Sequence, residues 1–110
     1  MVYNLEQRCL AFAISMRDFC LSLKKDTINL VYIKQVIRSS SSIGANYIEA
    51  NESLGKQDMK MKIRISRKEA KETQYWLELL MTENDEKRLF LKREAEELRK
   101  IFSAILNKLT

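Results

Sequence analysis

The sequence predicts an all-α protein: an antiparallel, up-down-up-down bundle of four helices that forms one domain over residues 1–110. The chain contains no proline and only two glycines, so few residues in it break helices. Apolar residues recur at alternating spacings of three and four through four segments, which is typical of core-facing helices. The polar breaks between the segments are short, which favours helices that turn back on their neighbours. Because a chain of this length buries only about two-thirds of its unfolded surface, assembly into a homo-oligomer would add stability.

The first two segments each have one apolar stripe. The first stripe consists of Leu5, Cys9, Phe12, Met16, Phe19 and Leu23. A polar break at 24–27 follows, in which Asp26 or Thr27 is suited to cap the next helix. The second segment runs to about Asn51, and its stripe consists of Leu30, Ile33, Ile37, Ser40, Gly44 and Tyr47, with Val36 and Ile43 beside it.

Four consecutive serines, residues 39–42, lie in the middle of the second segment, just before Gly44. Serine and glycine are poor helix formers, so one interpretation is a flexible loop that divides the segment. The other is a continuous helix whose small residues let a neighbouring helix come close, with serine hydroxyls bonded to the preceding turn. We favour the continuous helix, because the apolar spacing continues from Ile37 to Tyr47.

The third and fourth segments keep the same period. From about Lys56 to Thr82 the stripe consists of Met59, Ile63, Ser66, Ala70, Thr73, Leu77 and Leu80. In the polar turn at 82–86, Asn84 or Asp85 is suited to cap the last helix, and Glu94, Glu96 and Glu97 predict an acidic solvated face on it. The last stripe consists of Leu91, Ala95, Leu98, Phe102, Ile105 and Leu109.

Positive charge is concentrated in the third segment. Residues 56–71 contain seven basic and two acidic residues, a net charge of +5, whereas the rest of the chain has 13 of each. Such a surface is typical of phosphate-binding proteins, although many solvated helix faces are also basic. No aromatic residue interleaves with the cations, so we expect phosphate contacts with weak sequence selectivity and no base stacking. The predicted nucleic-acid-binding residues are Lys56, Lys60, Arg64, Arg67, Lys68 and Lys71.

The composition gives no support to an enzyme, a metal site or a cofactor. With no histidine and two cysteines, the chain lacks the usual zinc ligand sets and any Ser–His or Cys–His pair. Gly44 and Gly55 stand alone, so there is no glycine-rich phosphate loop. Cys9 and Cys20 are expected to be small buried side chains in a reducing, cytoplasmic environment. No apolar run approaches the roughly 20 residues of a membrane span, so we expect neither a membrane partner nor a secretory leader.

Two blocks of the sequence resemble a known family. Residues 35–50, QVIRSSSSIGANYIEA, and residues 68–80, KEAKETQYWLELL, look like those of the 23S rRNA-intervening sequence proteins, a family of four-helix bundles with no established enzymatic activity. The family includes accessory proteins of diversity-generating retroelements. The resemblance therefore implies a homopentameric barrel that binds nucleic acid beside a reverse transcriptase. Many members have proline where this chain has Gly44 and serine where it has Gly55, departures typical of a subfamily.

The polar residues of these blocks have two interpretations. Charged and amide side chains on two adjacent helices would form a polar network that fixes the helix register. Paired carboxylates also occur in acid–base and metal chemistry, but the chain lacks the Glu-x-x-His pairs of di-iron bundles, which favours the structural role. The predicted structural motif consists of Arg38, Ser42, Gly44, Asn46, Glu49, Glu69 and Glu72.

Apolar residues outside the core stripes are candidates for subunit contacts. Tyr75 and Trp76 are expected to be packing residues. The predicted oligomer interface consists of Leu10, Ile14, Leu21, Ile65, Trp76 and Leu79.

Two functions of different classes fit these observations. The first is a non-enzymatic, homo-oligomeric accessory protein, a pentamer, that binds RNA or DNA through the basic stripe of the third helix. The second is a structural or protein-interaction scaffold, whose basic stripe binds an acidic protein partner or keeps the assembly soluble.

Overall fold

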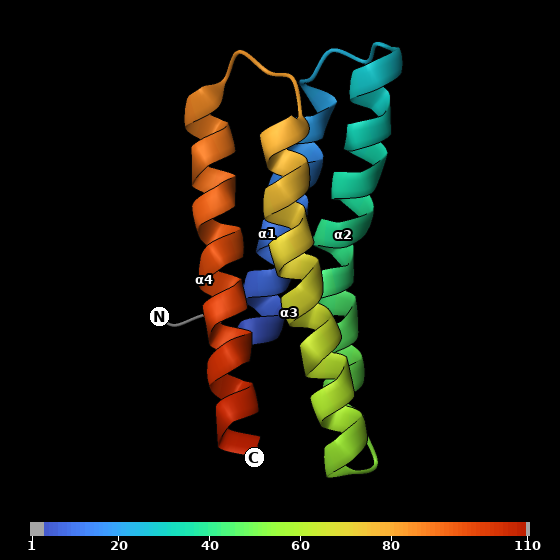
Figure 1. Ribbon diagram of the computed structural model, residues 1–110, viewed down its shortest axis with the longest axis vertical. Coiled ribbons are helices and arrows are strands. Elements are labelled where there is room, and N and C mark those ends of the chain that lie inside the picture. Colours follow the sequence, from blue (N-terminus) through green and yellow to red (C-terminus); the bar gives the residue numbers. More distant parts are fainter. Residues whose placement is uncertain (1–3, 110) are drawn as a thin grey trace.

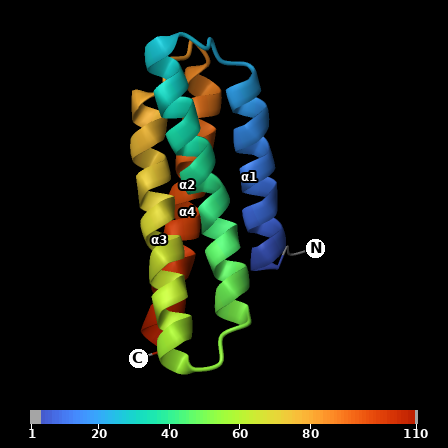
Figure 2. The ribbon, with the colours of Figure 1, turned by 90° about the vertical axis from the view of Figure 1, so that its right-hand side faces the viewer.

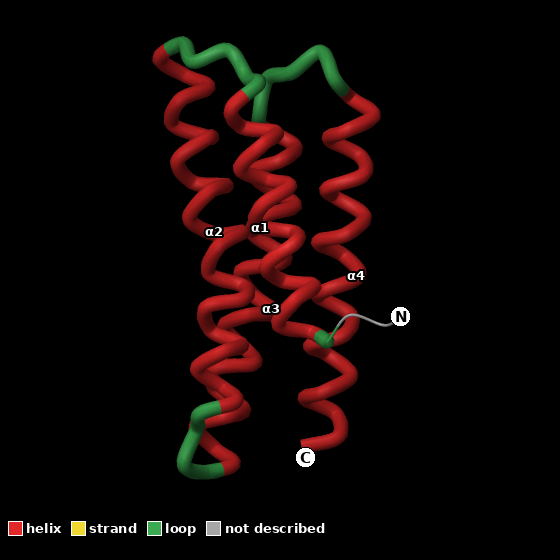
Figure 3. Tube along the Cα trace, turned by 180° about the vertical axis from the view of Figure 1, so that it is seen from behind, coloured by secondary structure: helices red, strands yellow, loops and turns green. Residues whose placement is uncertain are grey.

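The computed structural model describes residues 4–109 and contains four helices: α1 (Leu5–Leu21), α2 (Thr27–Asn51), α3 (Lys56–Leu79) and α4 (Asp85–Leu109). The helices lie side by side in an elongated bundle of 44 × 31 × 18 Å, and the described residues include no strand (Figure 1). The α1–α2 and α3–α4 loops lie at one end of the bundle and the α2–α3 loop lies at the other (Figure 3). Each helix therefore runs opposite to the one before it.

The shortest helix, α1, is also the least enclosed. It has 17 residues, whereas the other three have 24 or 25. It packs mainly against α2, while α3 packs along both α2 and α4 (Figure 2). As a result, the α2–α3 hairpin extends past the first turn of α1 (Figure 1). None of the helices within residues 4–109 combines the length and the hydropathy needed to cross a membrane.

The capping predictions identify the right residues at two helix starts. Asp26 accepts a hydrogen bond from the backbone N–H of Asn29 at 2.8 Å, and Asn84 accepts one from that of Lys87 at 3.0 Å. The first helix is capped in the same way by Asn4. Gly55 is the N-cap residue of α3, and this helix start has no side-chain capping hydrogen bond.

The buried core confirms the stripes predicted for α1 and α3 except at their first residues, Leu5 and Met59, which are half-buried, and it corrects the stripes of the other two helices. On α2, Val36 and Ile43 are fully buried, whereas the predicted stripe residues Leu30 and Ile37 are only half-buried. The reason is that α2 packs against both α1 and α3, so its buried side lies between the two contacts. On α4 the buried residue near the end is Leu106. The half-buried stripe residues there are Ile105 and Leu109.

The serine run forms part of a continuous helix, as predicted. Ser42 Oγ donates to the Arg38 carbonyl at 2.7 Å, and the hydroxyls of Ser39 and Ser40 bond back in the same way. A Cβ atom at Gly44 would lie 3.0 Å from the Cβ of Cys9, so α1 approaches α2 closely at this glycine.

The run also contacts α3. The Ser39 hydroxyl shares a 2.8 Å hydrogen bond with that of Thr73, and the Ser66 hydroxyl donates to the carbonyl of Ile43 at 2.9 Å. All three hydroxyl side chains are buried, so small polar residues let α3 also come close to α2.

A buried asparagine joins the two loops at one end of the bundle. The side-chain oxygen of Asn29 accepts from the backbone N–H of Met81 at 2.8 Å, and its amide nitrogen donates to the carbonyls of Lys24 and Met81 at 2.8 and 3.1 Å. This contact explains why α3 ends at Leu79, three residues before the predicted end. The backbone groups of Met81 bond to Asn29, and Leu80 is already extended, with ψ of 135°.

Candidate nucleic-acid interface

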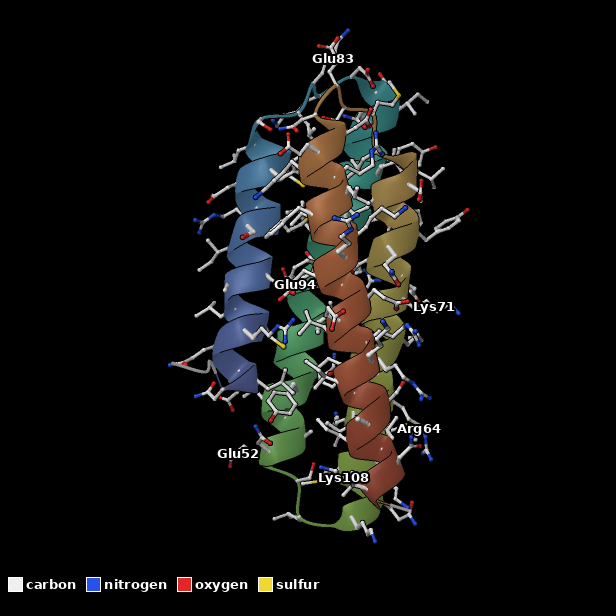
Figure 4. The ribbon with its side chains drawn as sticks, turned by 90° about the vertical axis from the view of Figure 1, so that its left-hand side faces the viewer. Glu52, Arg64, Lys71, Glu83, Glu94 and Lys108 are labelled. Atoms are coloured by element: carbon white, nitrogen blue, oxygen red, sulfur yellow. The ribbon has the colours of Figure 1, made fainter. Side chains whose placement is uncertain are left out.

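Cations from two helices surround one shallow recess on the outer side of the bundle. Arg64, Arg67, Lys68 and Lys71 come from α3, and Arg99 comes from α4. We call these five residues the basic recess. The side chains of Arg64 and Lys71 point away from the bundle on the same side of α3 (Figure 4). They lie together because residues spaced by three or four positions share one face of a helix.

Most of the positive charge in the basic recess is not neutralised by the protein. Within residues 4–109, Arg64, Lys68 and Lys71 form no ion pair with a carboxylate. Arg67 donates to the hydroxyl of Ser103 on α4 at 3.5 Å and keeps its charge uncompensated. The recess therefore presents cations that are available to an external anion.

One carboxylate partly offsets the positive charge of the basic recess. Glu96 on α4 accepts a hydrogen bond from Arg99, and this bond and the charges of Arg99, Lys100 and Lys71 lower the pKa of the Glu96 carboxyl. Glu96 is therefore ionised at neutral pH and pairs mainly with Arg99. The α3 cations carry the remaining net charge.

The structure brings together four of the six predicted nucleic-acid-binding residues. Lys60 and Lys56 lie on α3 on the N-terminal side of Arg64 and do not line the recess. Lys62 belongs to a different surface, because its ammonium group lies 3.6 Å from the carboxylate of Glu49 on α2. The charge that the sequence concentrates at 56–71 is thus divided between two sides of α3.

Arg99 and Ser103 are the residues of this site that the sequence did not indicate. The predicted acidic face of the last helix contains Glu96, whose negative charge lies three residues from Arg99. Placing Arg99 beside Lys71 requires the register between α3 and α4, and single-helix periodicity does not supply it. The only local signal is the spacing of Arg99 and Ser103, which puts both on one side of α4.

The predicted polar network is smaller than expected. Arg38 on α2 donates to the two carboxylate oxygens of Glu69 at 2.9 and 3.3 Å and to Glu72 at 3.5 Å, and these bonds raise the pKa of the Arg38 guanidinium. Asn46 is not part of the network, because its amide donates to the carbonyl of Ser42 in its own helix. Glu49 is also outside it and pairs with Lys62 instead.

These carboxylates have structural partners. Glu69 is 6% exposed and faces Arg38, and Glu72 faces the same guanidinium. The described part of the chain contains no cluster of three or more His, Cys, Asp or Glu residues placed to hold a metal ion. The motif therefore fixes α2 against α3 at Arg38, and Gly44 fixes α1 against α2.

The candidate interface residues fall into two groups. Leu10, Ile14 and Leu21 are exposed on α1, at 61%, 39% and 68%. Ile65, Trp76 and Leu79 are half-buried on α3. Leu10, Ile14 and Leu21 follow one side of α1 at intervals of four and seven residues, so they form one exposed apolar stripe.

Tyr75 corrects a prediction. The sequence predicts that Tyr75 packs into the bundle, but its side chain is 60% exposed. Trp76 does pack against the core, and the two rings meet edge to face with centroids 5.3 Å apart. Within the described residues, the buried indole nitrogen of Trp76 has no hydrogen-bond partner.

Both cysteines are buried and unpaired, as predicted. Burial raises the pKa of the Cys9 thiol to about 12 and that of the Cys20 thiol to about 11. At neutral pH both are therefore protonated in the folded protein, and a buried, protonated thiol is a poor nucleophile and a poor metal ligand.

The fold and the basic recess define a small four-helix-bundle protein with a cationic surface on its third helix. The chain belongs to the 23S rRNA-intervening sequence protein family, whose sequence model matches residues 3–109. A solved structure from Bacteroides thetaiotaomicron, described as a protein of unknown function from the S23 ribosomal protein family, is 30% identical to it. The two match with a TM-score of 0.81 over 94% of this chain and 98% of the other. No curated protein matches the chain, and neither description names an enzymatic activity.

Proposed function

We propose that this chain is a non-enzymatic accessory protein that assembles into a homopentamer and binds RNA or DNA through the basic recess. The observation that carries the proposal is the geometry of that recess. Within residues 4–109, Arg64, Lys68 and Lys71 line the recess without carboxylate partners, and Arg99, which pairs with Glu96, lines the same recess from α4. Cations that have no internal partner and share one face are suited to the phosphates of a nucleic-acid backbone.

Assembly would strengthen a weak contact. One recess offers only a few phosphate contacts, but a ring of five chains at +5 each would carry a formal charge of +25. Recesses on one rigid assembly bind the same strand at a high effective concentration, so the affinity of the ring exceeds that of the single chain.

The exposed stripe of α1 supports assembly. We propose that Leu10, Ile14 and Leu21 of one chain contact the α3 residues Ile65, Trp76 and Leu79 of the next. Contact between two different faces is heterologous, and heterologous contacts form a ring when the rotation between successive chains closes. The ring would work in the cytoplasm, where buried thiols stay reduced. A second protein that acts on the bound strand, such as a reverse transcriptase, is the proposed partner.

Three substitutions test the recess without altering the core: Arg64→Gln, Lys68→Gln and Lys71→Gln, combined in one variant. We expect binding to labelled RNA and DNA, measured by fluorescence anisotropy at several salt concentrations, to be weakened at least tenfold. The slope of log affinity against log salt should become shallower by about 2–3, because each lost phosphate contact removes roughly 0.7–0.9.

A matched control changes the same charge elsewhere. Lys24→Gln, Lys34→Gln and Arg93→Gln also remove three exposed cations, from the α1–α2 loop, α2 and α4. This variant should keep the affinity and the salt slope of the wild type within about twofold. Equal losses in both variants would show that only the overall charge matters, which would contradict a site at the basic recess.

Light scattering on the same samples tests the assembly. A pentamer of 13.0 kDa chains has five times that mass, about 65 kDa. A 65 kDa particle that binds neither RNA nor DNA near 50 mM salt would contradict the nucleic-acid proposal. That result would favour the scaffold function, with an acidic protein as the partner of the recess.

A further inference from the structure

An exposed aromatic ring lies at the end of the cationic face of α3. Arg64, Lys68, Lys71 and Tyr75 follow one another at intervals of four, three and four residues. At about 100° per residue these positions fall within a sector of roughly 60° on the helix surface. The four residues span about 16 Å along the axis, and Tyr75 is one turn beyond Lys71.

The surroundings of Tyr75 leave one side of the ring open. The side chain is 60% exposed, and its hydroxyl makes no hydrogen bond within the described residues. Trp76 meets it at an interplanar angle of 68°, with 5.3 Å between the ring centroids. Since Trp76 packs against the core, it supports the tyrosine ring from one side. A large ring that is held in place and uncovered is suited to contact a flat external group.

We propose that Tyr75 stacks on an unpaired base while Lys71, Lys68 and Arg64 contact the phosphates of the same strand, so that the preferred ligand is single-stranded nucleic acid. This inference rests on the proposed function and names its substrate class. Proteins that bind single strands combine a cationic track with an aromatic side chain on which a base stacks. A base inside a duplex has both faces covered by its neighbours and has no free face for Tyr75. This stacking would add a base contact to a site that the sequence predicts to make phosphate contacts alone.

The test compares a single strand with a duplex. The probes are a labelled oligothymidylate or oligouridylate of about 12 nucleotides and a blunt-ended duplex without a loop, compared at the same concentration of phosphates. Tyr75→Ala should weaken binding to the single strand about tenfold and leave binding to the duplex within twofold. Tyr75→Phe should bind both probes as the wild type does, because the ring is retained. The salt slope should stay the same in both variants, since neither removes a cation.

A matched control and a third probe separate stacking from other effects. Phe90 is 57% exposed on α4, nine residues before Arg99 and thus half a turn away around the helix, so Phe90→Ala should leave both affinities unchanged. An abasic strand with the same number of phosphates should bind the wild type and the Tyr75→Ala variant equally.

The possible results distinguish this inference from the proposed function. If the wild type and the Tyr75→Ala variant bind the single strand with equal affinity, the stacking role is overturned and the phosphate site is retained. Equal weakening on the duplex or the abasic strand would also overturn it. A changed mass of Tyr75→Ala by light scattering would assign Tyr75 to a subunit contact instead. Wild-type protein that binds no probe near 50 mM salt would overturn both proposals.

Discussion

The guanidinium of Arg38 on α2 donates two hydrogen bonds to the carboxylate of Glu69 on α3, at 2.9 and 3.3 Å. The two partners differ in environment, because the Arg38 side chain is 52% exposed and that of Glu69 is 8% exposed. The buried carboxylate of Glu69 is therefore paired with a cation, Arg38, that remains in contact with water. Loss of the cation would leave the carboxylate without a charged partner in the interface between the two helices.

The first prediction concerns this pair. Arg38→Met should lower the free energy of unfolding by about 1–2 kcal/mol, which is below the cost of breaking a fully buried pair because water reaches Arg38. Arg38→Lys should recover only part of the loss, since an ammonium group cannot reproduce the two-point contact. Urea denaturation gives both values.

A double-mutant cycle provides the control. Arg38→Met in a Glu69→Gln background should cost clearly less than in the wild type, because the buried charge is then absent. Additive effects of the two substitutions would show that the pair contributes nothing to the stability of the α2–α3 contact.

The second prediction concerns Gly44. Alanine is the better helix former by about 1 kcal/mol, but its Cβ would lie 3.0 Å from the Cβ of Cys9. The Cys9 atom is fixed to the α1 backbone and cannot move aside alone, so α1 must shift. We expect Gly44→Ala to destabilise the protein by about 1 kcal/mol despite the gain in helix propensity, as measured by thermal unfolding.

Ser41→Ala is the matched control in the same helix. Ser41 is exposed, so alanine there adds helix propensity without meeting a neighbour, and it should be neutral or slightly stabilising. Stabilisation by both substitutions would mean that α1 moves away from Gly44 at no cost.

Much of the fold follows from the sequence because the position and the caps of each helix depend on the local sequence of that helix alone. Period and composition place all four helices, and at two helix starts residue type gives a pair of candidate caps that includes the observed one, Asp26 or Asn84. The serine run was the exception, because propensity and periodicity disagreed there. Periodicity was the better guide, since packing against α1 and α3 supplies the stability that serine and glycine do not.

Two of the features that the sequence did not indicate depend on the register between helices. Arg99 joins the basic recess only because α4 packs antiparallel to α3, and Asn29 reaches Met81 only because two loops meet. Tyr75 and Trp76 are both expected to be packing residues, yet consecutive residues on a helix point in directions about 100° apart, and only Trp76 packs against the core. The basic recess was thus predictable as a stripe on one helix and not as a surface shared by two.

The third prediction concerns Asn29, whose side chain is completely buried. Asn29→Ala should lower the free energy of unfolding by about 2–3 kcal/mol, because it leaves the N–H and C=O of Met81 without partners. Chemical denaturation checks this value. A loss below about 0.5 kcal/mol would show that the two loops do not depend on the asparagine.

Asn29→Asp adds a pH dependence with a definite sign. The carboxylate still accepts from Met81 but faces the carbonyls of Lys24 and Met81, so the folded state raises its pKa above the unfolded value of about 3.9. The penalty is therefore present above about pH 4 and shrinks as the pH falls, because the protonated acid donates to a carbonyl. A penalty that does not change between pH 7 and pH 4 would contradict this arrangement.

The fourth prediction uses the two thiols as probes of unfolding. Burial holds the pKa of Cys9 at about 12 and that of Cys20 at about 11, so at pH 8 both thiols are protonated and enclosed in the folded state. A thiol-specific disulfide reagent should label the native protein at least a hundredfold more slowly than the urea-unfolded chain. Because the pKa values are raised on folding, the unfolded state ionises first, and stability should fall as the pH rises above about 8.5. Replacing both cysteines with alanine should remove the part of this loss that comes from the thiols. Rapid labelling of the native protein at pH 8 would show that α1 separates readily from α2, the helix against which it mainly packs, and that Gly44 and Cys9 do not hold the two together.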